Sequence, residues 1–242
     1  MKIKEVSKKI RRALPLKNCG AVIVAAGSAS RMGGIDKVMA ELKGEPMVLR
    51  TVRAFQQSDV IRSVVIVTRP DLVETISGLC QGMDKVCAVV AGGSSRQASV
   101  AAGLKALPRG TELVAVHDAA RPLISQAVID RTVRAAHTYG AAAPAIPVKD
   151  TVKVVNGGIV SATPDRSKLR AVQTPQVFDL ELLKGALEKA RKDNAEVTDD
   201  CSAVERLGMS VKIVEGDEQN LKVTTPMDLQ IARLILEESS CG

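Results

Sequence analysis

The chain contains very few aromatic residues. Among its 242 residues there is no Trp, one Tyr (Tyr139) and two Phe (Phe55 and Phe178). Proteins that bind single-stranded nucleic acid stack the bases on aromatic side chains, so we do not expect a nucleic-acid partner. The hydrophobic residues, which make up 45% of the chain, are therefore mostly aliphatic and are numerous enough for a large core.

Long apolar segments and metal-binding motifs are also missing. No stretch approaches the ~20 apolar residues that a membrane-spanning helix requires, so we expect no membrane association. The five cysteines are scattered, form no CxxC pair and show no metal-ligand spacing with the two histidines. An odd, dispersed set of cysteines is typical of reduced thiols in a cytoplasmic protein.

Positive charge is the main compositional bias. The formal net charge is +7 at pH 7, which favours anionic partners such as nucleic acid or a phosphorylated small molecule. Part of this charge lies in residues 1–19, which we interpret as a basic leader before a domain at 20–242. The leader and the apolar run at 21–26 resemble a secretory signal, but the run is too short and Arg31 and Lys37 follow it closely.

After the leader, short apolar runs alternate with helical segments. Apolar runs that end in small residues are typical of buried parallel strands, and proline, serine and glycine mark several helix ends. This alternation predicts an α/β fold with a single doubly wound, mostly parallel sheet. The expected strands are 21–25, 63–68, 85–90, 113–117, 141–148, 169–172 and 211–214. The expected helices are 46–57, 70–79, 95–106, 125–139, 179–193, 198–207 and 226–238.

A predicted hairpin interrupts this order. Residues 150–155 and 159–162 are expected to form two strands joined by an Asn-Gly turn at 156–158. A lone two-stranded hairpin has too little core to be stable. We therefore expect a β-arm at about residues 150–168 that leans on something else, such as another subunit.

The segment after the first expected strand is a candidate anion site, because ligands of such sheets bind beyond the carboxyl ends of the strands. It begins with Ala25, Ala26 and Gly27 and continues to Arg31 and Lys37. Small residues let backbone N–H groups approach an anion closely, and the two bases are spaced to bind the same anion. The spacing fits neither a Walker loop nor GxGxxG. A flexible loop with two solvated bases is the alternative.

The segment after the third expected strand has the same character. It is rich in small residues and precedes a helix. A base or sugar could pack against Gly92 and Gly93, with Ser94 and Ser99 offering hydrogen bonds. A simple helix cap at Ser94 or Ser95 is an equally good interpretation.

Asp118 follows the fourth expected strand and faces the same edge of the sheet. A carboxylate among phosphate-binding cations is a natural ligand for Mg²⁺, because the metal bridges phosphate oxygens. The alternatives are a helix cap and a salt bridge to Arg121. The neighbouring His117 is expected to be a strand-end histidine held by another residue and not a catalytic group.

Three further polar residues carry no pattern that indicates chemistry. Thr198 is expected to cap a helix, with the two aspartates after it favouring the helix dipole. Arg166 and Lys222 are expected to be surface charges. Periodicity alone therefore assigns no function to any of the three.

Seven motifs in order and in spacing resemble the 2-C-methyl-D-erythritol 4-phosphate cytidylyltransferase family. Each motif is weak alone, but together they extend from about residue 20 to residue 236. They are AAGSASRMG at 25–33 with Lys37, AGGSSRQASV at 91–100, VHDAARP at 116–122, DTVK at 150–153, QTPQVF at 173–178, TDD at 198–200 and NLKVTTPMDL at 220–229.

The resemblance implies a Rossmann-like nucleotidyltransferase fold and a step of non-mevalonate isoprenoid synthesis. CTP and methylerythritol phosphate would give CDP-methylerythritol and pyrophosphate, with Mg²⁺ held by Asp118. Arg31 and Lys37 would stabilise the transition state of an in-line attack that needs no general base. The residues implied to bind CTP are Ala25, Ala26, Gly27, Gly93, Ser94, Ala98, Ser99 and Ala119. Those implied to position the substrate are Asp118, Arg121, Thr151, Arg166, Thr198 and Lys222.

The resemblance also implies a homodimer, because the arm in this family exchanges between subunits and would place Thr151 and Arg166 across the interface. The sequence departs from the family pattern at three positions. Ala29 stands where Gly is usual, Asp36 where Pro usually precedes the lysine, and Ser94 where Asp is frequent. These departures affect the fine geometry of the loops but leave the cations in place.

Three alternative functions are open. The nearest is another nucleotidyltransferase of the same fold, such as ribitol 5-phosphate cytidylyltransferase or a sugar-1-phosphate enzyme, although the segments at 165–166 and 173–176 favour methylerythritol phosphate. A non-catalytic basic protein that binds nucleic acid would need stacking residues that the chain lacks. A catalytically dead nucleotide-binding regulator is disfavoured because Arg31, Lys37 and Asp118 are all present.

Overall fold

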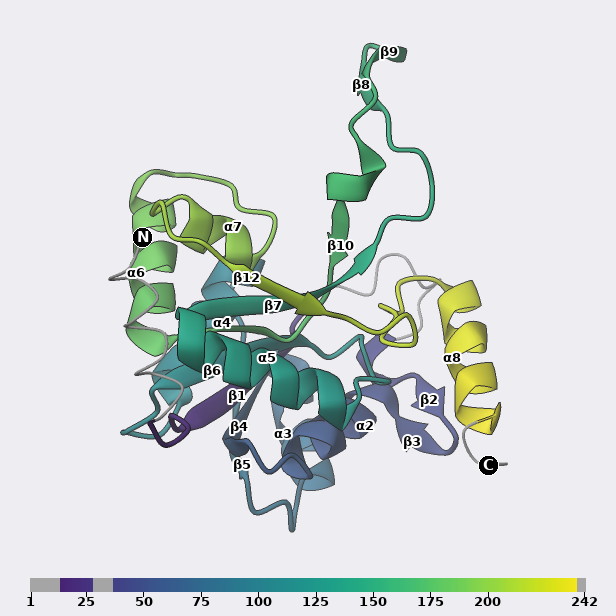
Figure 1. Cartoon of the computed structure of the whole chain (residues 1–242). Coiled ribbons are helices and arrows are strands. Elements are labelled where there is room, and N and C mark those ends of the chain that lie inside the picture. The colour runs from purple at the N-terminus through teal and green to yellow at the C-terminus, as the bar shows by residue number, and fades with distance from the viewer. Residues whose placement is uncertain (1–13, 28–36, 239–242) are drawn as a thin grey trace.

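A central mixed sheet organises the computed structural model, which describes residues 14–27 and 37–238. Within these residues eight strands form the sheet, in the order β10-β7-β11-β6-β1-β4-β5, with β12 paired to β7 (Figure 1). Strands β1, β4, β5 and β6 are parallel, whereas β10 and β11 run antiparallel to their neighbours. The strands are β1 (Cys19–Ala25), β4 (Ile61–Thr68), β5 (Val86–Ala91), β6 (Leu113–Asp118), β7 (Ala141–Pro147), β10 (Arg170–Val172), β11 (Gln176–Asp179) and β12 (Lys212–Glu215).

Helices cover both faces of this sheet, which confirms the predicted doubly wound α/β fold. Strand β1 shows the reason, because successive side chains of a strand point to opposite faces. Ile23 packs in the cluster with α2, α3 and α5, whereas Val22 packs in the cluster with α4, α6 and α7. The helices of the first face are α2 (Met47–Gln56), α3 (Val73–Leu79) and α5 (Gln126–Tyr139); those of the second are α4 (Arg96–Ala106), α6 (Leu180–Lys192) and α7 (Asp200–Glu205). A short 3-10 helix, η2 (Pro70–Leu72), precedes α3 where a continuous helix was expected.

A third, smaller cluster joins distant parts of the chain at one end of the sheet. Leu42 and Met47 are fully buried there and pack with Val223 and Leu229. Its residues come from β2 (Glu41–Leu42), the start of α2, α8 (Pro226–Glu238), the segment before α8, and Ala40, which follows the 3-10 helix η1 (Lys37–Met39). Strand β3 (Glu45–Pro46) pairs with β2. The cluster therefore places the residues that follow the first loop beside the segment that carries Lys222.

Strand β11 was not expected from the sequence. It lies between β6 and β7, with Gln176 beside Val116 and Val177 beside Ala142. Its four residues follow a proline and are too few to show a period of two. Because β11 is antiparallel to β6, its first residue lies at the carboxyl end of β6, where the sequence predicted a ligand site.

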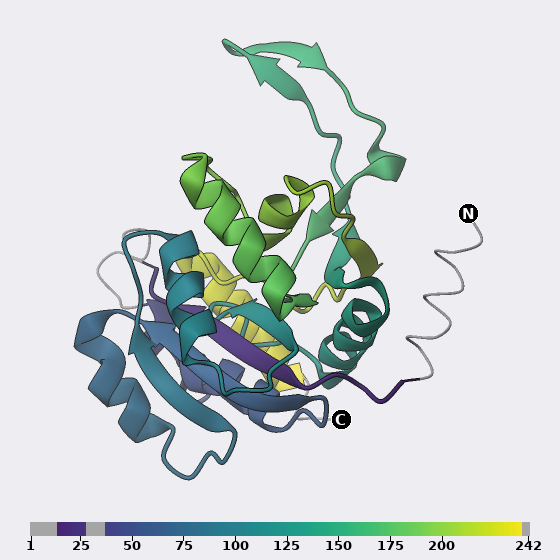
Figure 2. The ribbon, with the colours of Figure 1, turned by 90° about the vertical axis from the view of Figure 1, so that its left-hand side faces the viewer.

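The predicted hairpin is confirmed, but its turn is not the expected one. Strands β8 (Val154–Asn156) and β9 (Ile159–Ala162) pair, with Asn156 opposite Ile159, so Gly157 and Gly158 form the turn. Their φ angles of 57° and 82° are in the region that glycine adopts most readily. The hairpin and the 3-10 helix η3 (Arg166–Lys168) project away from the sheet in both views (Figures 1 and 2).

Several expectations stay predictions. Residues 1–13 lie outside the described part of the chain, so the division into a leader at 1–19 and a domain at 20–242 stays a prediction.

The described cysteines, Cys19, Cys80, Cys87 and Cys201, are free thiols. No helix within the described ranges is long and apolar enough to cross a membrane.

Candidate functional site

Three loops meet at the carboxyl edge of the sheet. The loops after β1 and β5 are in direct contact, because a Cβ on Gly92 would lie 2.6 Å from the Cβ of Ala26 and 2.8 Å from the Oγ of Ser99. The loop after β6 lies beside them, because the backbone N–H of Ala119 donates to the Val24 carbonyl at 3.0 Å. The expected edge is therefore a continuous surface made from three distant segments.

The loop after β5 is held by the first turn of α4. Ser95 is the N-cap residue, and its Oγ accepts from the Ala98 N–H at 3.1 Å. The Oγ of Ser99 accepts from the Gly93 N–H at 3.2 Å and donates to the Ser95 carbonyl at 2.9 Å. The expected cap is thus Ser95, whereas Ser94 is exposed. Ser99 shapes the loop through these bonds.

Asp118 lies at the end of β6 between two cations. Its Oδ1 accepts from Arg96 Nη1 at 2.9 Å and its Oδ2 from Lys222 Nζ at 2.7 Å. Burial by itself would raise the pKa of Asp118, but Arg96 and Lys222 overcome this effect and hold it well below its usual range. Asp118 is therefore ionised. The expected alternative of a pair with Arg121 is wrong. Lys222 is exposed, as expected of a surface charge, and it is also paired with Asp118.

Arg96 joins Asp118 to a second buried carboxylate. Its Nη2 lies 2.7 Å from Oδ2 of Asp200, whose side chain is only 3% exposed. Burial raises the pKa of Asp200 to about 6 against the opposing attraction of Arg96, and the carboxylates of Asp118 and Asp199 add to the rise. Sequence analysis assigned no role to Arg96, and it related Asp200 only to the dipole of its helix. The available signal was a single arginine within a run of small residues, which is too weak to indicate a partner.

Gln176 fixes the position of Asp200. Its Oε1 accepts from the backbone N–H of Asp200 at 3.0 Å, and its Nε2 donates to Oδ2 of Asp199 at 2.7 Å. One side chain on β11 therefore anchors the start of α7 to the sheet. Because β11 was not expected, this role was also missed.

Thr198 does not cap α7, which corrects the sequence-based expectation. The N-cap is Asp199, whose carboxylate accepts from the Ser202 N–H at 2.9 Å within a capping box. Asp is at least as good an N-cap as Thr, and the serine three residues later completes the reciprocal bond. Thr198 is the exposed residue before the cap.

His117 is fully buried and engaged at both ring nitrogens. The Arg121 carbonyl can only accept, so Nε2 donates to it at 3.2 Å, and Nδ1 of the neutral ring accepts from Thr174 Oγ1 at 2.9 Å. Thr174 Oγ1 also accepts from the Asp118 N–H at 3.2 Å. Burial lowers the pKa of His117 to about 3. The expectation of a strand-end histidine held by neighbours is confirmed.

Arg121 presents a donor without an acceptor. Its Nη1 donates to the Asn220 carbonyl at 2.6 Å, while its Nε is buried and has no acceptor among the residues that the structure describes. Asn220 is itself held by a bond from its Nδ2 to the Thr174 carbonyl at 2.9 Å. A buried donor of this kind fits an anion, because guanidinium groups match carboxylate and phosphate oxygens.

The first loop is described only in part. Ala25 is buried at the end of β1 and Gly27 is exposed, whereas Arg31, Ala29 and Asp36 lie outside the described residues. Lys37 is partly buried and begins η1, whose Val38 packs in the same core cluster as Ala25 and Ala119. The expected convergence of Arg31 and Lys37 with Asp118 stays a prediction.

Thr151 and Arg166 lie on the arm, away from this cluster of charges. Both are exposed, and Arg166 donates to the Lys149 carbonyl. Neither forms a hydrogen bond or ion pair with Asp118 or Lys222, all four residues being described. Within one chain, the structure thus brings together the predicted residues Gly93, Ser99, Ala119, Asp118, Arg121 and Lys222, but it does not bring the arm residues to them.

The donor set fits Mg²⁺ only with help from a ligand. Among the described residues, no group of three or more His, Cys, Asp or Glu side chains is placed to hold a metal. Mg²⁺ in nucleotide sites is commonly bound by one or two carboxylates together with phosphate oxygens. Each oxygen of Asp118 accepts from one cation and keeps a further lone pair, so Asp118 can be such a ligand when phosphates supply the other donors.

Comparison with known proteins gives a consistent result. A family model described as 2-C-methyl-D-erythritol 4-phosphate cytidylyltransferase matches residues 19–238. A relative of that name from Desulforamulus reducens is 47% identical over 233 residues, covering 93% of this chain and 98% of the relative. Another from Geobacillus kaustophilus is 45% identical over 222 residues, covering 90% and 97%.

Solved structures agree with the sequence comparison. A 4-diphosphocytidyl-2C-methyl-D-erythritol synthase from Anaerococcus prevotii has a TM-score of 0.84 and 32% identity, covering 92% of this chain and 100% of that one. A 2-C-methyl-D-erythritol 4-phosphate cytidylyltransferase from Thermus thermophilus has a TM-score of 0.74 and 33% identity, covering 89% and 98%. The chain therefore belongs to the 2-C-methyl-D-erythritol 4-phosphate cytidylyltransferase family.

Proposed function

We propose that this protein transfers a cytidylyl group from CTP to 2-C-methyl-D-erythritol 4-phosphate, giving CDP-methylerythritol and pyrophosphate. Family membership over nearly the whole chain supports the reaction and both substrates. The observation that carries the proposal is the ionised Asp118, held between Arg96 and Lys222 where the loops after β1, β5 and β6 meet. This arrangement suits a ligand that carries several phosphates and a divalent cation.

The chemistry needs orientation and charge compensation more than proton transfer. The phosphate of the acceptor attacks the α-phosphorus of CTP in line; the new phosphorus–oxygen bond forms as the bond to the bridging oxygen breaks, and pyrophosphate leaves. An ionised phosphate needs no general base. His117 is consistent with this, because it is neutral, buried and bonded at both nitrogens.

Residues at different positions of the site would have different roles in the reaction. The small residues of the loops, Ala25, Ala26, Gly27, Gly93, Ser94, Ala98, Ser99 and Ala119, would bind CTP. Arg31 and Lys37 would stabilise the charge that develops at the α-phosphate. The buried Nε of Arg121 would donate to an anionic oxygen of a substrate.

Asp118 would hold Mg²⁺ in this reaction. The bound metal would neutralise charge on the nucleotide phosphates. Arg96 and Lys222 keep the carboxylate of Asp118 ionised and fixed in direction through bonds of 2.9 Å and 2.7 Å. Lys222 would also contact the acceptor phosphate, together with Thr198.

The active assembly would be a cytoplasmic homodimer. Strands β8 and β9 of the arm expose four large aliphatic side chains, Val154, Val155, Ile159 and Val160, with exposed fractions from 44% to 75%. Such a surface on a hairpin without its own core is typical of an interface. Exchange of the arm would carry Thr151 and Arg166 to the site of the partner subunit.

Product formation tests the proposal directly. Pyrophosphate release from CTP is measured with methylerythritol phosphate, ribitol 5-phosphate or no acceptor, each with and without Mg²⁺. We expect rapid release only with methylerythritol phosphate and Mg²⁺. Asp118→Asn should abolish it, whereas the matched surface variant Asp130→Asn should not. Equal or faster release with ribitol 5-phosphate would instead identify the other cytidylyltransferase.

A further inference from the structure

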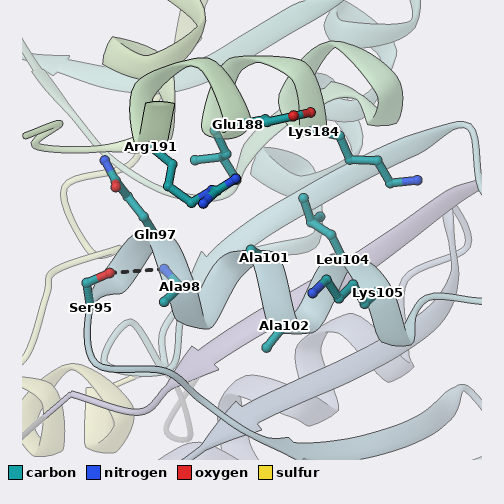
Figure 3. A pocket seen from close by; sticks show the side chains of 11 residues that line it. Ser95, Gln97, Ala98, Ala101, Ala102, Leu104, Lys105, Lys184, Glu188 and Arg191 are labelled. Carbon is teal, nitrogen blue, oxygen red and sulfur yellow. Dashed lines mark hydrogen bonds between the residues drawn. The ribbon is translucent and has the colours of Figure 1, made fainter. Parts of the chain in front are cut away.

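A groove between α4 and α6 borders the site described above and shares Ser95 and Ala98 with it. Its volume is about 700 Å³, within the range of small-molecule sites. Figure 3 shows the two helices side by side, with Ala98, Ala101 and Leu104 on α4 and side chains of α6 opposite them. Leu187 of α6 completes the apolar lining. The small alanine side chains leave the space open, so the groove offers an apolar floor to a ligand.

Positive charge surrounds this apolar floor. Lys105 and Lys184 lie toward one end of the groove, and Arg191 extends from α6 toward α4 at the other (Figure 3). Lys105 and Arg191 form no ion pair with any described residue, while Lys184 pairs with the exposed Glu181 at 2.8 Å. The single carboxylate of the lining, Glu188, is already paired with Lys192 at 2.7 Å. The groove is therefore cationic at its rim and apolar at its floor.

We propose that this groove binds a small amphipathic anion, with an apolar body on the alanine and leucine floor and an anionic head at the lysine and arginine rim. Burial of the apolar body supplies affinity in proportion to the area removed from water. The head gains charge-assisted hydrogen bonds from Lys105 or Arg191, neither of which forms an ion pair with a described residue. A purely apolar ligand would leave these cations unused, and a purely ionic one would leave the floor exposed.

The groove adjoins the loop after β5, which is one of the loops proposed to bind CTP. Ser95 and Ala98 line it, and the same two residues form the N-cap bond of α4. A Cβ on Gly93 would lie 2.4 Å from the Cβ of Ala98, so the loop packs tightly on the first turn of this helix. A ligand in the groove would therefore change the affinity for CTP, a consequence that rests on the proposed function.

Calorimetric titration of the full-length protein with octyl phosphate, below its micelle concentration, tests the site. We expect saturable binding, with octanol and inorganic phosphate each at least about tenfold weaker, since each lacks one half of the interaction. Octanoate should behave like octyl phosphate if any anionic head is accepted. No saturable binding, or equal binding of inorganic phosphate, would overturn the proposal.

Matched variants locate the binding. Ala101→Leu fills the floor and should abolish binding, and Arg191→Gln should weaken it about tenfold. Lys189→Gln makes the same charge change on α6 outside the groove and should have less than about a twofold effect. Octyl phosphate affinity that is unchanged in Ala101→Leu would place the ligand elsewhere and overturn the assignment.

The coupling is measured separately, as the Kd of CTP with and without saturating octyl phosphate. We expect a change of about fivefold or more, which Ala101→Leu should abolish. An unchanged Kd overturns the coupling. If CTP does not bind at all, the proposed function and the coupling both fail, whereas the calorimetry on octyl phosphate alone still decides the groove.

Discussion

The carboxyl edge of the sheet and the β8–β9 arm have opposite chemistry. At the edge, Asp118 and Asp200 are buried and held by Arg96, with side chains 12% and 3% exposed. On the arm, Val155 and Ile159 are 52% and 75% exposed. A monomeric protein usually buries its apolar side chains and exposes its charges. Both regions reverse that distribution.

The two reversals have different explanations. A buried ion network is weak evidence for stability, because desolvation offsets the attraction, so its position at the meeting point of three loops indicates chemistry. Exposed aliphatic residues on a hairpin gain nothing in water, so they indicate a surface that a partner covers. The edge thus depends on contacts within the chain, and the arm is expected to depend on contacts outside it.

Removal of Arg96 should have the largest effect on stability. Arg96→Met leaves Asp200 buried without a cation and should lower the free energy of unfolding by about 3 kcal/mol. Denaturant unfolding measures this, with Arg134→Met, which breaks an exposed pair with Asp130, as the control at under about 1 kcal/mol.

A second substitution sharpens the test of Arg96. Arg96→Met combined with Asp200→Asn should recover roughly half of the loss, because the uncompensated carboxylate is gone while Lys222 still pairs with Asp118. If the double variant is no more stable than the single one, the buried charge of Asp200 is not what Arg96 offsets.

Lys37 tests whether the edge carries the chemistry. Lys37→Ala should lower kcat roughly 100-fold by removing a transition-state contact, while unfolding changes little. Steady-state pyrophosphate release measures the rate, and substitution of an exposed lysine of α6, Lys189→Ala, is the control. Near-normal turnover in Lys37→Ala would remove the role assigned to this lysine.

His117 should make the body of the protein sensitive to acid. Its pKa is about 3 in the folded state, against about 6.5 in an unfolded chain. Between these two pKa values the unfolded state binds more protons than the folded state. The contribution of His117 to stability is therefore complete above pH 6.5 and is lost as the pH falls toward 3. Unfolding at pH 5 should cost about 2 kcal/mol less than at pH 7.5 through this group alone. His117→Gln should show a correspondingly flatter dependence.

The arm should give the smallest effect on folding of the single chain. Ile159→Lys replaces an exposed side chain and should change protomer stability by under about 0.5 kcal/mol. The same substitution should shift the protein to monomers in sedimentation analysis. Lys168→Met, on the exposed 3-10 helix beside the hairpin, provides a control. A dimer that tolerates Ile159→Lys would contradict the assignment of the arm to the interface.

Much of the architecture could be predicted from local patterns. Residue patterns along the chain predicted three elements that the structure contains. These are strand β1, helix α5 with its C-cap at Gly140 (φ 86°), and the hairpin of β8 and β9. Their signals are local, because period, caps and turn residues depend on neighbours in sequence. The expected capping of α7 by Thr198 failed because Asp199, one residue later, competes for the same role.

The sequence alone determined the alternation of strands and helices. It also determined that Asp118 ends a strand at the edge where a ligand is expected, and that Lys37 follows the loop after the first strand. Only the tertiary structure decided that Arg96 reaches Asp200, 104 residues away, and that β11 brings Gln176 to hold it. The physical reason is that ion pairs between distant segments depend on register and packing, which no local period encodes, whereas the hydrophobic pattern that builds each element is written within a few consecutive residues.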